Sequence, residues 1–338
     1  MAKYSRIAVI YGSDTSEWEI SCKSGEFTAE SIDNTVYEVY EIFARFGKWQ
    51  LAAYRKKNSQ RVAIEEKSRP DIDKSDFSVV LDGEKVNFDY AYIMQHGTPG
   101  ENGLTQGYLQ IIGIPFSSCD SFVSAVAFDK YSCKTYIRNL DCVKFAPDVF
   151  VRKGEDEEAF VAKVNSTLSY PVFVKPTAGG SSFGVTKVKK PEDLPAALQY
   201  AFSEGDTVIA EQGVEGRELT CAAYFDGSKV VTLPQVEITT ENEYFDYDAK
   251  YNGKSNEICP APVSESERQA ISTATAGIYS MLGCKGLVRV DYILAKDGLY
   301  FLEINMIPGM TKASLVPRMV RTAGMKMSDF LSTVIENS

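Results

Sequence analysis

The sequence lacks any apolar run that approaches the roughly 20 residues needed to cross a bilayer. Its amino-terminal stretch, MAKYSRIAVIYGSD, has a short apolar run but not the charged, apolar and small-residue order of a secretory signal. Both absences favour a cytoplasmic protein without a membrane partner.

Cysteine and histidine are too sparse or too scattered for several kinds of site. The seven cysteines are odd in number and include no CxxC pair, which argues against a disulfide framework or a zinc site. We expect them to be buried thiols. The turn after the first apolar run, at Gly12, lacks the GxGxxG pattern, so no dinucleotide site is expected there.

Positive charge is also in deficit. Lysine and arginine total 36 against 46 acidic residues, which gives a net charge of −10 and a pI near 4.9. A nucleic-acid interface needs a basic face, so a nucleic-acid partner is not expected.

What is present is the pattern of an α/β (α+β) protein. A chain of 338 residues with 44% hydrophobic content predicts about two to three domains. An apolar strand at 6–11, a helix at 17–34 and strands at 78–81 and 90–94 predict a small parallel sheet. A single helix is expected at 124–137. We expect domains at 1–117, 118–211 and 212–338.

A hairpin near the carboxyl terminus predicts a metal site. A three-residue loop at 296–298 would place Asp291 opposite Glu303, and the two-residue strand period returns Asn305 to the same face. Three oxygen ligands suit Mg²⁺, with Mn²⁺ as the alternative, held together with phosphate oxygens. A solvated acidic pair on an ordinary hairpin is the competing interpretation, but Arg289 on the same face disfavours it.

The segment KPTAGGSSFG, residues 175–184, predicts an anion cradle. It combines a lysine at a strand end with glycines that expose backbone N–H groups and with two hydroxyls between them. A P-loop would place the lysine after the glycines. A flexible connection is the alternative for such a loop taken alone.

Nine blocks in order along the chain resemble the D-alanine:D-alanine ligases of the ATP-grasp family. The blocks are SEWEIS (16–21), QHGTPGENG (95–103), QGYLQIIGIPF (106–116), DKYSCK (129–134), FVKPTAGGSSFGV (173–185), AEQGVEGRELT (210–220), FDYDAKY (245–251), ICPAPV (258–263) and the run from 286 to 317. The resemblance implies a three-domain ATP-grasp fold, with ATP as co-substrate and Mg²⁺ as cofactor. It also implies a homodimer.

The resemblance assigns residues to the nucleotide half of the site. Lys130 and Lys175 would contact phosphates, Glu211 would contact adenine and Glu218 the ribose. The full set of nucleotide positions is Lys130, Lys175, Ser181, Ser182, Glu211, Glu218 and Lys250. In this half, two positions depart from the family: Gln212 replaces a common lysine, and Gly179 replaces a glutamate found in some members.

The same resemblance assigns the amino-acid half. Glu17 matches the residue that binds the first ammonium group, and His96, the only histidine, lines that subsite. A lone histidine is otherwise more often structural. The second carboxylate would be received by Lys250, Ser314 and the N–H of Leu315. Arg289 and the N–H of Gly309 match an oxyanion site, and Ser181 and Tyr251 match a hydrogen-bonded link to Glu17.

The implied reaction joins two D-alanine molecules through D-alanyl phosphate and supplies peptidoglycan precursor synthesis. A ligase that takes D-serine or D-lactate as second substrate is a near alternative. The segment FDYDAKY favours D-alanine over D-lactate, whereas one extra hydroxyl in a pocket changes selectivity by only about two orders of magnitude. A catalytically silent nucleotide-binding module is disfavoured, because the expected phosphate and metal ligands are all present.

Overall fold

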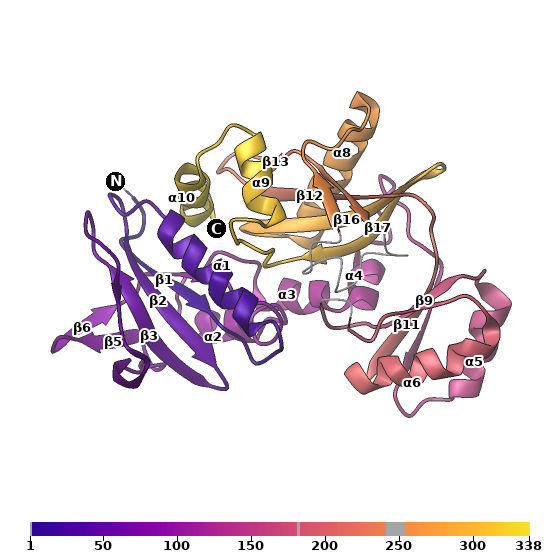
Figure 1. Ribbon diagram of the computed structural model, residues 1–338, viewed down its shortest axis with the longest axis horizontal. Coiled ribbons are helices and arrows are strands. Elements are labelled where there is room, and N and C mark those ends of the chain that lie inside the picture. Colours follow the sequence, from indigo (N-terminus) through magenta and orange to yellow (C-terminus); the bar gives the residue numbers. More distant parts are fainter. Residues whose placement is uncertain (1, 181–182, 241–254) are drawn as a thin grey trace.

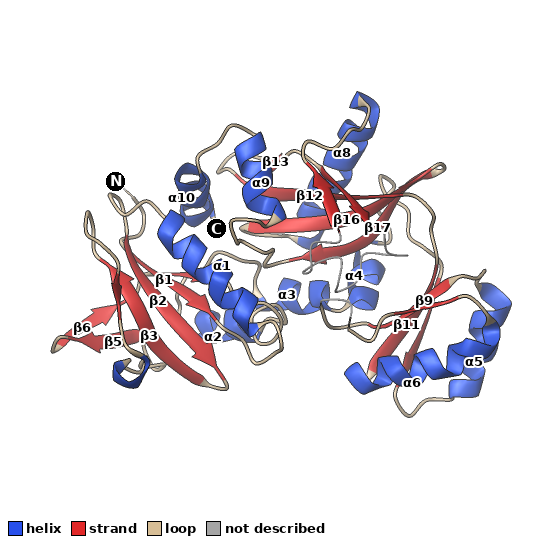
Figure 2. Cartoon of the chain, viewed as in Figure 1, coloured by secondary structure: helices blue, strands red, loops and turns tan. Residues whose placement is uncertain are grey.

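The computed structural model describes residues 2–180, 183–240 and 255–338. Three larger sheets follow one another along the chain, with helices packed around them (Figures 1 and 2). None of the helices in these described ranges is both long and apolar enough to span a membrane.

The first sheet has the strand order β4-β3-β2-β1-β7. Its strands are β1 (Arg6–Tyr11), β2 (Glu38–Arg45), β3 (Lys48–Arg55), β4 (Val62–Ala63) and β7 (Tyr90–Ile93). The predicted parallel sheet is confirmed only at its centre, where β1 lies parallel to β2 and β7. On one side of the sheet, β3 lies antiparallel to β2 and the edge strand β4 lies antiparallel to β3, because short connections join these strands.

Residues 78–81 do form a strand, but it lies outside this sheet. That strand, β5 (Ser78–Leu81), pairs with β6 (Glu84–Asn87) in a separate hairpin. The predicted helix at 17–34 is α1 (Trp18–Ser31), which packs on β1 and β2 (Figure 1). The remaining elements of this part are η1 (Glu66–Ser68) and α2 (Leu104–Ile111).

The single helix predicted at 124–137 is wrong, because the chain breaks at Asp129 into α3 (Ser121–Phe128) and α4 (Lys130–Ile137). The Asp129 carboxylate accepts the Ser132 N–H at 2.7 Å and also a hydrogen bond from the Thr177 hydroxyl. Aspartate is a favoured residue at a helix start, and here it begins α4 so that Lys130 is the first helical residue. The break therefore places Lys130 beside the glycine-rich loop.

The second sheet, of order β10-β9-β11-β8, carries α5 and α6 on one side (Figure 2). Its elements are β8 (Asp148–Arg152), α5 (Glu157–Thr167), β9 (Val172–Pro176), β10 (Thr186–Val188), η2 (Pro191–Asp193), α6 (Leu194–Glu204) and β11 (Thr207–Gln212). This part has a hydrophobic core of its own.

The third sheet has the order β15-β14-β12-β16-β17, with β13 beside β12. The elements are β12 (Arg217–Phe225), β13 (Val230–Thr232), β14 (Val236–Thr240), β15 (Ser255–Ile258), α8 (Glu265–Leu282), β16 (Leu287–Ala295), β17 (Gly298–Asn305), α9 (Leu315–Thr322) and α10 (Met327–Asn337). Ser264 and Glu267 form a capping box at the start of α8.

One large hydrophobic core joins the first and third sheets. The carboxyl-terminal helix α10 packs against α1, and its Glu336 accepts hydrogen bonds from the Lys3 N–H at 2.8 Å and the Tyr37 hydroxyl at 2.7 Å. The first and third sheets each lie within one expected domain range, whereas β11 of the second sheet extends one residue past 211. We propose boundaries near residues 117 and 211. All seven cysteines are free thiols; four are buried and Cys22, Cys142 and Cys259 are half-buried.

Candidate active site

A cavity of about 350 Å³ opens where the start of α1, residues 96–101, the α3–α4 region, β17 and the following turn meet. Its walls are contributed by sequence segments that are far apart in the chain. The predicted site residues that line it are Glu17, His96, Lys130, Arg289, Glu303, Asn305, Gly309, Ser314 and Leu315.

The hairpin of β16 and β17 reaches the predicted pairing by a different route. The three-residue loop is wrong: Ala295 pairs with Gly298, which leaves a two-residue turn. A bulge between Asp291 and Tyr292 then shifts the register by one residue, so Asp291 does lie opposite Glu303. The extra residue corrects the one-residue slip that the shorter turn introduces.

The Asp291 carboxylate is buried and accepts hydrogen bonds at both oxygens. Arg289 donates to it twice, at 2.9 and 2.8 Å, and the Asn305 amide donates at 3.0 Å. The Thr220 hydroxyl, on the neighbouring strand β12, donates at 2.5 Å. Burial lowers the pKa of Arg289, but the adjacent Asp291 outweighs it and raises that pKa. The guanidinium is therefore a fixed positive charge on the cavity wall.

The donors on this hairpin fit a hard divalent cation. Asp291, Glu303 and Asn305 offer carboxylate and amide oxygens, which are the ligands that Mg²⁺ prefers. Both carboxylates already attract positive charge, because Arg289 pairs with Asp291 and the Lys130 ammonium lies 3.6 Å from Glu303. In the described part of the chain, no cluster of three or more His, Cys, Asp or Glu residues suggests another metal site.

The glycine-rich loop lies against Glu17. The Lys130 ammonium donates to the Gly179 carbonyl at 2.8 Å, and a Cβ atom on Gly180 would lie only 3.1 Å from Oε2 of Glu17. Gly179 has φ +135°, a conformation that favours glycine, and this gives a physical reason for the departure at that position. The glycine-rich loop therefore lies next to the amino-terminal part of the chain at the Glu17 carboxylate.

His96 is buried beside this carboxylate. Its Nε2 lies 3.0 Å from the Ser24 hydroxyl. Burial lowers the pKa of His96, although Glu17 and a hydrogen bond with the Ile307 backbone act in the opposite direction. The ring is therefore neutral near pH 7. It lines the cavity as a hydrogen-bonding group and does not add a second positive charge to that of Arg289.

At another part of the cavity wall, α9 begins at Leu315. The first N–H groups of a helix have no carbonyl partner within the helix, and the helix dipole favours a negative charge at this position. The Ser314 hydroxyl lies within hydrogen-bond distance of the Thr311 N–H, at 2.9 Å, and of the Thr311 hydroxyl, at 2.7 Å. This arrangement suits a carboxylate ligand.

Lys175 and Glu211 lie on adjacent strands, β9 and β11, and form an ion pair. Glu218 is half-buried on β12, in the third sheet. Gln212, the second departure from the family, turns its side chain to the Ser169 N–H at 3.0 Å. The predicted residues Ser181, Ser182, Lys250 and Tyr251 lie outside the described residues.

The sequence argument missed three residues of the site region. Glu101 lines the cavity, and its carboxylate accepts the Gly97 N–H at 2.8 Å. Burial, with Glu17 nearby, raises the pKa of Glu101 to about 8. The Thr220 hydroxyl donates a hydrogen bond to Asp291, and the Lys134 ammonium donates one to Glu211. Glu101 lies inside QHGTPGENG and Lys134 lies one helical turn after Lys130, which were the available signals.

Two protein families match the chain in sequence. Residues 6–119 match the family described as D-ala D-ala ligase N-terminus, and residues 138–336 match D-ala D-ala ligase C-terminus. A D-alanine--D-alanine ligase of Phocaeicola vulgatus is 42% identical over 335 residues, covering 98% of each chain. Its counterpart in Parabacteroides distasonis is 43% identical, covering 98% of this chain and 96% of the relative.

Solved structures agree with these sequence relatives. The VanG D-Ala:D-Ser ligase from Enterococcus faecalis superposes with a TM-score of 0.86 at 29% identity, over 98% of this chain and 99% of that one. The D-alanine--D-alanine ligase from Bacillus anthracis complexed with ATP gives 0.74 at 26% identity, over 98% and 96%. The coverage of both halves in sequence and structure shows that this chain belongs to the D-alanine--D-alanine ligase family, with the ATP-grasp fold.

Proposed function

We propose that the protein ligates two D-alanine molecules to D-alanyl-D-alanine at the expense of ATP, which yields ADP and phosphate. The observation that carries the proposal is one cavity lined by a carboxylate, Glu17, by a guanidinium, Arg289, and by the start of helix α9. The ligase must bind the ammonium group of one amino acid and the carboxylate of the other, so it needs both a negative and a positive region in one cavity. The product supplies peptidoglycan precursor synthesis.

In the first step, the carboxylate of one D-alanine attacks the γ-phosphorus of ATP. Glu17 holds the ammonium group of that molecule, and the neutral His96 ring lines the same subsite. Lys130 and Lys175 hold phosphate oxygens, and Ser181 and Ser182 contribute from the glycine-rich loop. Closing this loop over the site excludes the water that would hydrolyse the acyl phosphate.

In the second step, the amine of the second D-alanine attacks the acyl carbon and phosphate leaves. Ser314, the Leu315 N–H and Lys250 hold the second carboxylate. Arg289 and the Gly309 N–H stabilise the negative charge that develops on the acyl oxygen. Ser181 and Tyr251 link to Glu17 and order the loops around both substrates.

Nucleotide binding uses Glu211 for adenine and Glu218 for the ribose hydroxyls. ATP-grasp ligases use a divalent metal, and we assign Mg²⁺, with Mn²⁺ as a substitute, to Asp291, Glu303 and Asn305. These three residues would hold the cation, which would supply positive charge against the triphosphate.

We also assign a cytoplasmic location, where ATP is available, and a homodimeric state. The family relationship supports both assignments. Light scattering at micromolar concentration tests the second: a mass of two chains agrees with it, and a mass of one chain contradicts it.

A D-Ala:D-Ser ligase is the second candidate, because the VanG structure superposes with a TM-score of 0.86. The segment FDYDAKY lies outside the described residues. D-alanine remains the first candidate because the sequence relatives at 42% and 43% identity carry that name.

Product analysis distinguishes the two candidates. The protein is incubated with ATP, Mg²⁺ and D-alanine, alone and with D-serine or D-lactate in competition. D-alanyl-D-alanine as the main product in every mixture supports the proposal. A main product of D-alanyl-D-serine favours the second candidate, and no D-alanine-dependent ADP release refutes both.

A further inference from the structure

A buried cluster of four charges lies between α4 and the second sheet. At its centre is Lys134, whose side chain is 1% exposed. Its ammonium lies 2.5 Å from Oε1 of Glu211, 2.7 Å from Oδ2 of Asp148 and 3.1 Å from the Ala146 carbonyl. A lysine ammonium has three protons, so these three acceptors satisfy it completely.

Glu211 is shared between two lysines. Its Oε1 accepts from Lys134, and its Oε2 pairs with Lys175. Burial alone raises the pKa of Glu211, but Lys175 and Lys134 together lower it to about 2. The cluster is neutral overall, with two ammonium groups and two carboxylates.

The two lysines differ in what they can do. Lys134 lies on α4, faces three protein acceptors and stays enclosed between α4, β8 and β11. Lys175 lies at the end of β9, directly before the glycine-rich loop, with its side chain 9% exposed. Under the proposed function Lys175 contacts phosphate, so it must turn away from Glu211 when ATP enters.

We propose that Lys134 is a positioning residue for nucleotide binding, which holds the Glu211 carboxylate so that Lys175 can turn from Glu211 to the triphosphate. The inference rests on the proposed function. With Lys134 present, Glu211 keeps one buried cation after Lys175 leaves. Without Lys134, the same movement strands Glu211 and Asp148 in the interior without a positive partner, which is strongly unfavourable. Lys175 then stays with Glu211.

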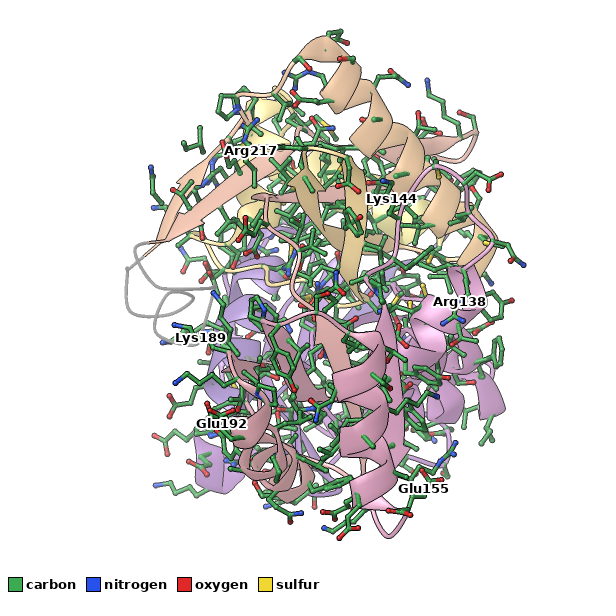
Figure 3. The ribbon with its side chains drawn as sticks, turned by 90° about the vertical axis from the view of Figure 1, so that its right-hand side faces the viewer. Arg138, Lys144, Glu155, Lys189, Glu192 and Arg217 are labelled. Carbon is green, nitrogen blue, oxygen red and sulfur yellow. The ribbon has the colours of Figure 1, made fainter. Side chains whose placement is uncertain are left out.

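The test separates this role from simple stabilisation. Lys134→Met removes the charge at similar length but leaves the cluster one positive charge short. Lys134→Met combined with Asp148→Asn restores charge balance with only the Lys175 and Glu211 pair remaining. The matched control is Lys144→Met, which removes a lysine from a surface pair with Asp297 in which both side chains are about half exposed or more (Lys144 is labelled in Figure 3).

Each variant is measured in three ways: urea unfolding, calorimetric titration with a non-hydrolysable ATP analogue and Mg²⁺, and KM values for ATP and D-alanine. We expect Lys134→Met to be less stable and to bind the analogue at least about tenfold more weakly. The double variant recovers stability but keeps the weakened nucleotide binding. The KM for D-alanine stays within about twofold throughout, and Lys144→Met matches the wild type in all measurements.

Nucleotide affinity that returns to the wild-type value together with stability in the double variant overturns the proposal, because Lys134 would then act only on folding. An equal loss of ATP and D-alanine affinity also overturns it. If Lys134→Met does not fold, the double variant alone decides. The titration needs no turnover, so its outcome is independent of whether the wild-type protein forms D-alanyl-D-alanine.

Discussion

Replacing Glu211 with glutamine removes the shared anion of the buried cluster while keeping its shape. In the wild-type protein, Lys175 and Lys134 lower the carboxyl pKa from 4.5 to about 2, against the effect of burial. At 1.36 kcal/mol per tenfold change in the ionisation constant, this corresponds to about 3 kcal/mol of folding stability at pH 7. Glu211 is only 7% exposed, so solvent screening reduces this value little. We therefore expect Glu211→Gln to lower the free energy of unfolding by about 3 kcal/mol.

The pH dependence follows from the direction of the shift. A lowered pKa in the folded protein contributes stability that is fully present above the unfolded value, 4.5, and is lost as the pH falls towards 2. The difference between wild type and Glu211→Gln should therefore shrink from about 3 kcal/mol at pH 7 to about 1 kcal/mol at pH 3. Urea unfolding of the ligand-free protein at both pH values measures this difference.

A surface glutamate of the same part of the chain provides the control. Glu155, at the lower edge of the view in Figure 3, forms an exposed pair with Arg152 at 3.8 Å. Glu155→Gln should change stability by less than about 1 kcal/mol at either pH. A Glu211→Gln variant as stable as the wild type at pH 7, or a difference that grows as the pH falls, would refute the reasoning.

Three further predictions concern the cavity and its loops. Glu303→Gln should keep the fold but weaken Mg²⁺ binding and phosphoryl transfer by roughly tenfold or more, because a charged ligand becomes neutral; unchanged turnover at saturating Mg²⁺ contradicts the metal assignment. Tyr251→Phe should alter D-alanine affinity and second-substrate selectivity by the loss of a hydrogen bond worth about 1 kcal/mol, while direct ATP titration stays near wild type; lost ATP binding with unchanged D-alanine kinetics would move Tyr251 to the nucleotide half. Because the pKa of Glu101 is raised from 4.5 to about 8, its contribution to stability is present below pH 4.5 and is lost as the pH rises through 8. The melting temperature of Glu101→Gln relative to wild type should thus rise progressively between pH 5 and pH 8. A difference in melting temperature that is constant across this range would contradict the interpretation of Glu101 as a buried neutral carboxyl.

The hairpin shows how far the sequence could predict the site. Alternation and turn residues correctly indicated two strands and the pairing of Asp291 with Glu303. The sequence did not reveal the two-residue turn or the bulge, because a shift of one residue in the turn and one in the strand cancel at Asp291. Hydrophobic periodicity cannot distinguish a regular hairpin with a three-residue loop from one in which a shorter turn and a bulge offset each other.

The missed residues depend on contacts between distant segments. Lys134 reads as one more polar residue on a short helix, and only the packing of α4 against β8 and β11 surrounds it with carboxylates. The helix break at Asp129 likewise depends on Thr177, 48 residues away, whose hydroxyl donates to the aspartate that begins α4. Local propensity carries no information about such partners.

Transfer of an oxygen atom tests the central claim most directly. D-alanine labelled with ¹⁸O in its carboxylate is incubated with the protein, ATP and Mg²⁺, and the inorganic phosphate is examined by mass spectrometry or ³¹P NMR. If the carboxylate attacks the γ-phosphorus to form D-alanyl phosphate, each phosphate released in step with D-alanyl-D-alanine carries a single ¹⁸O atom from D-alanine. Phosphate without label would contradict the acyl phosphate route, and label recovered in AMP would show attack at the α-phosphorus instead.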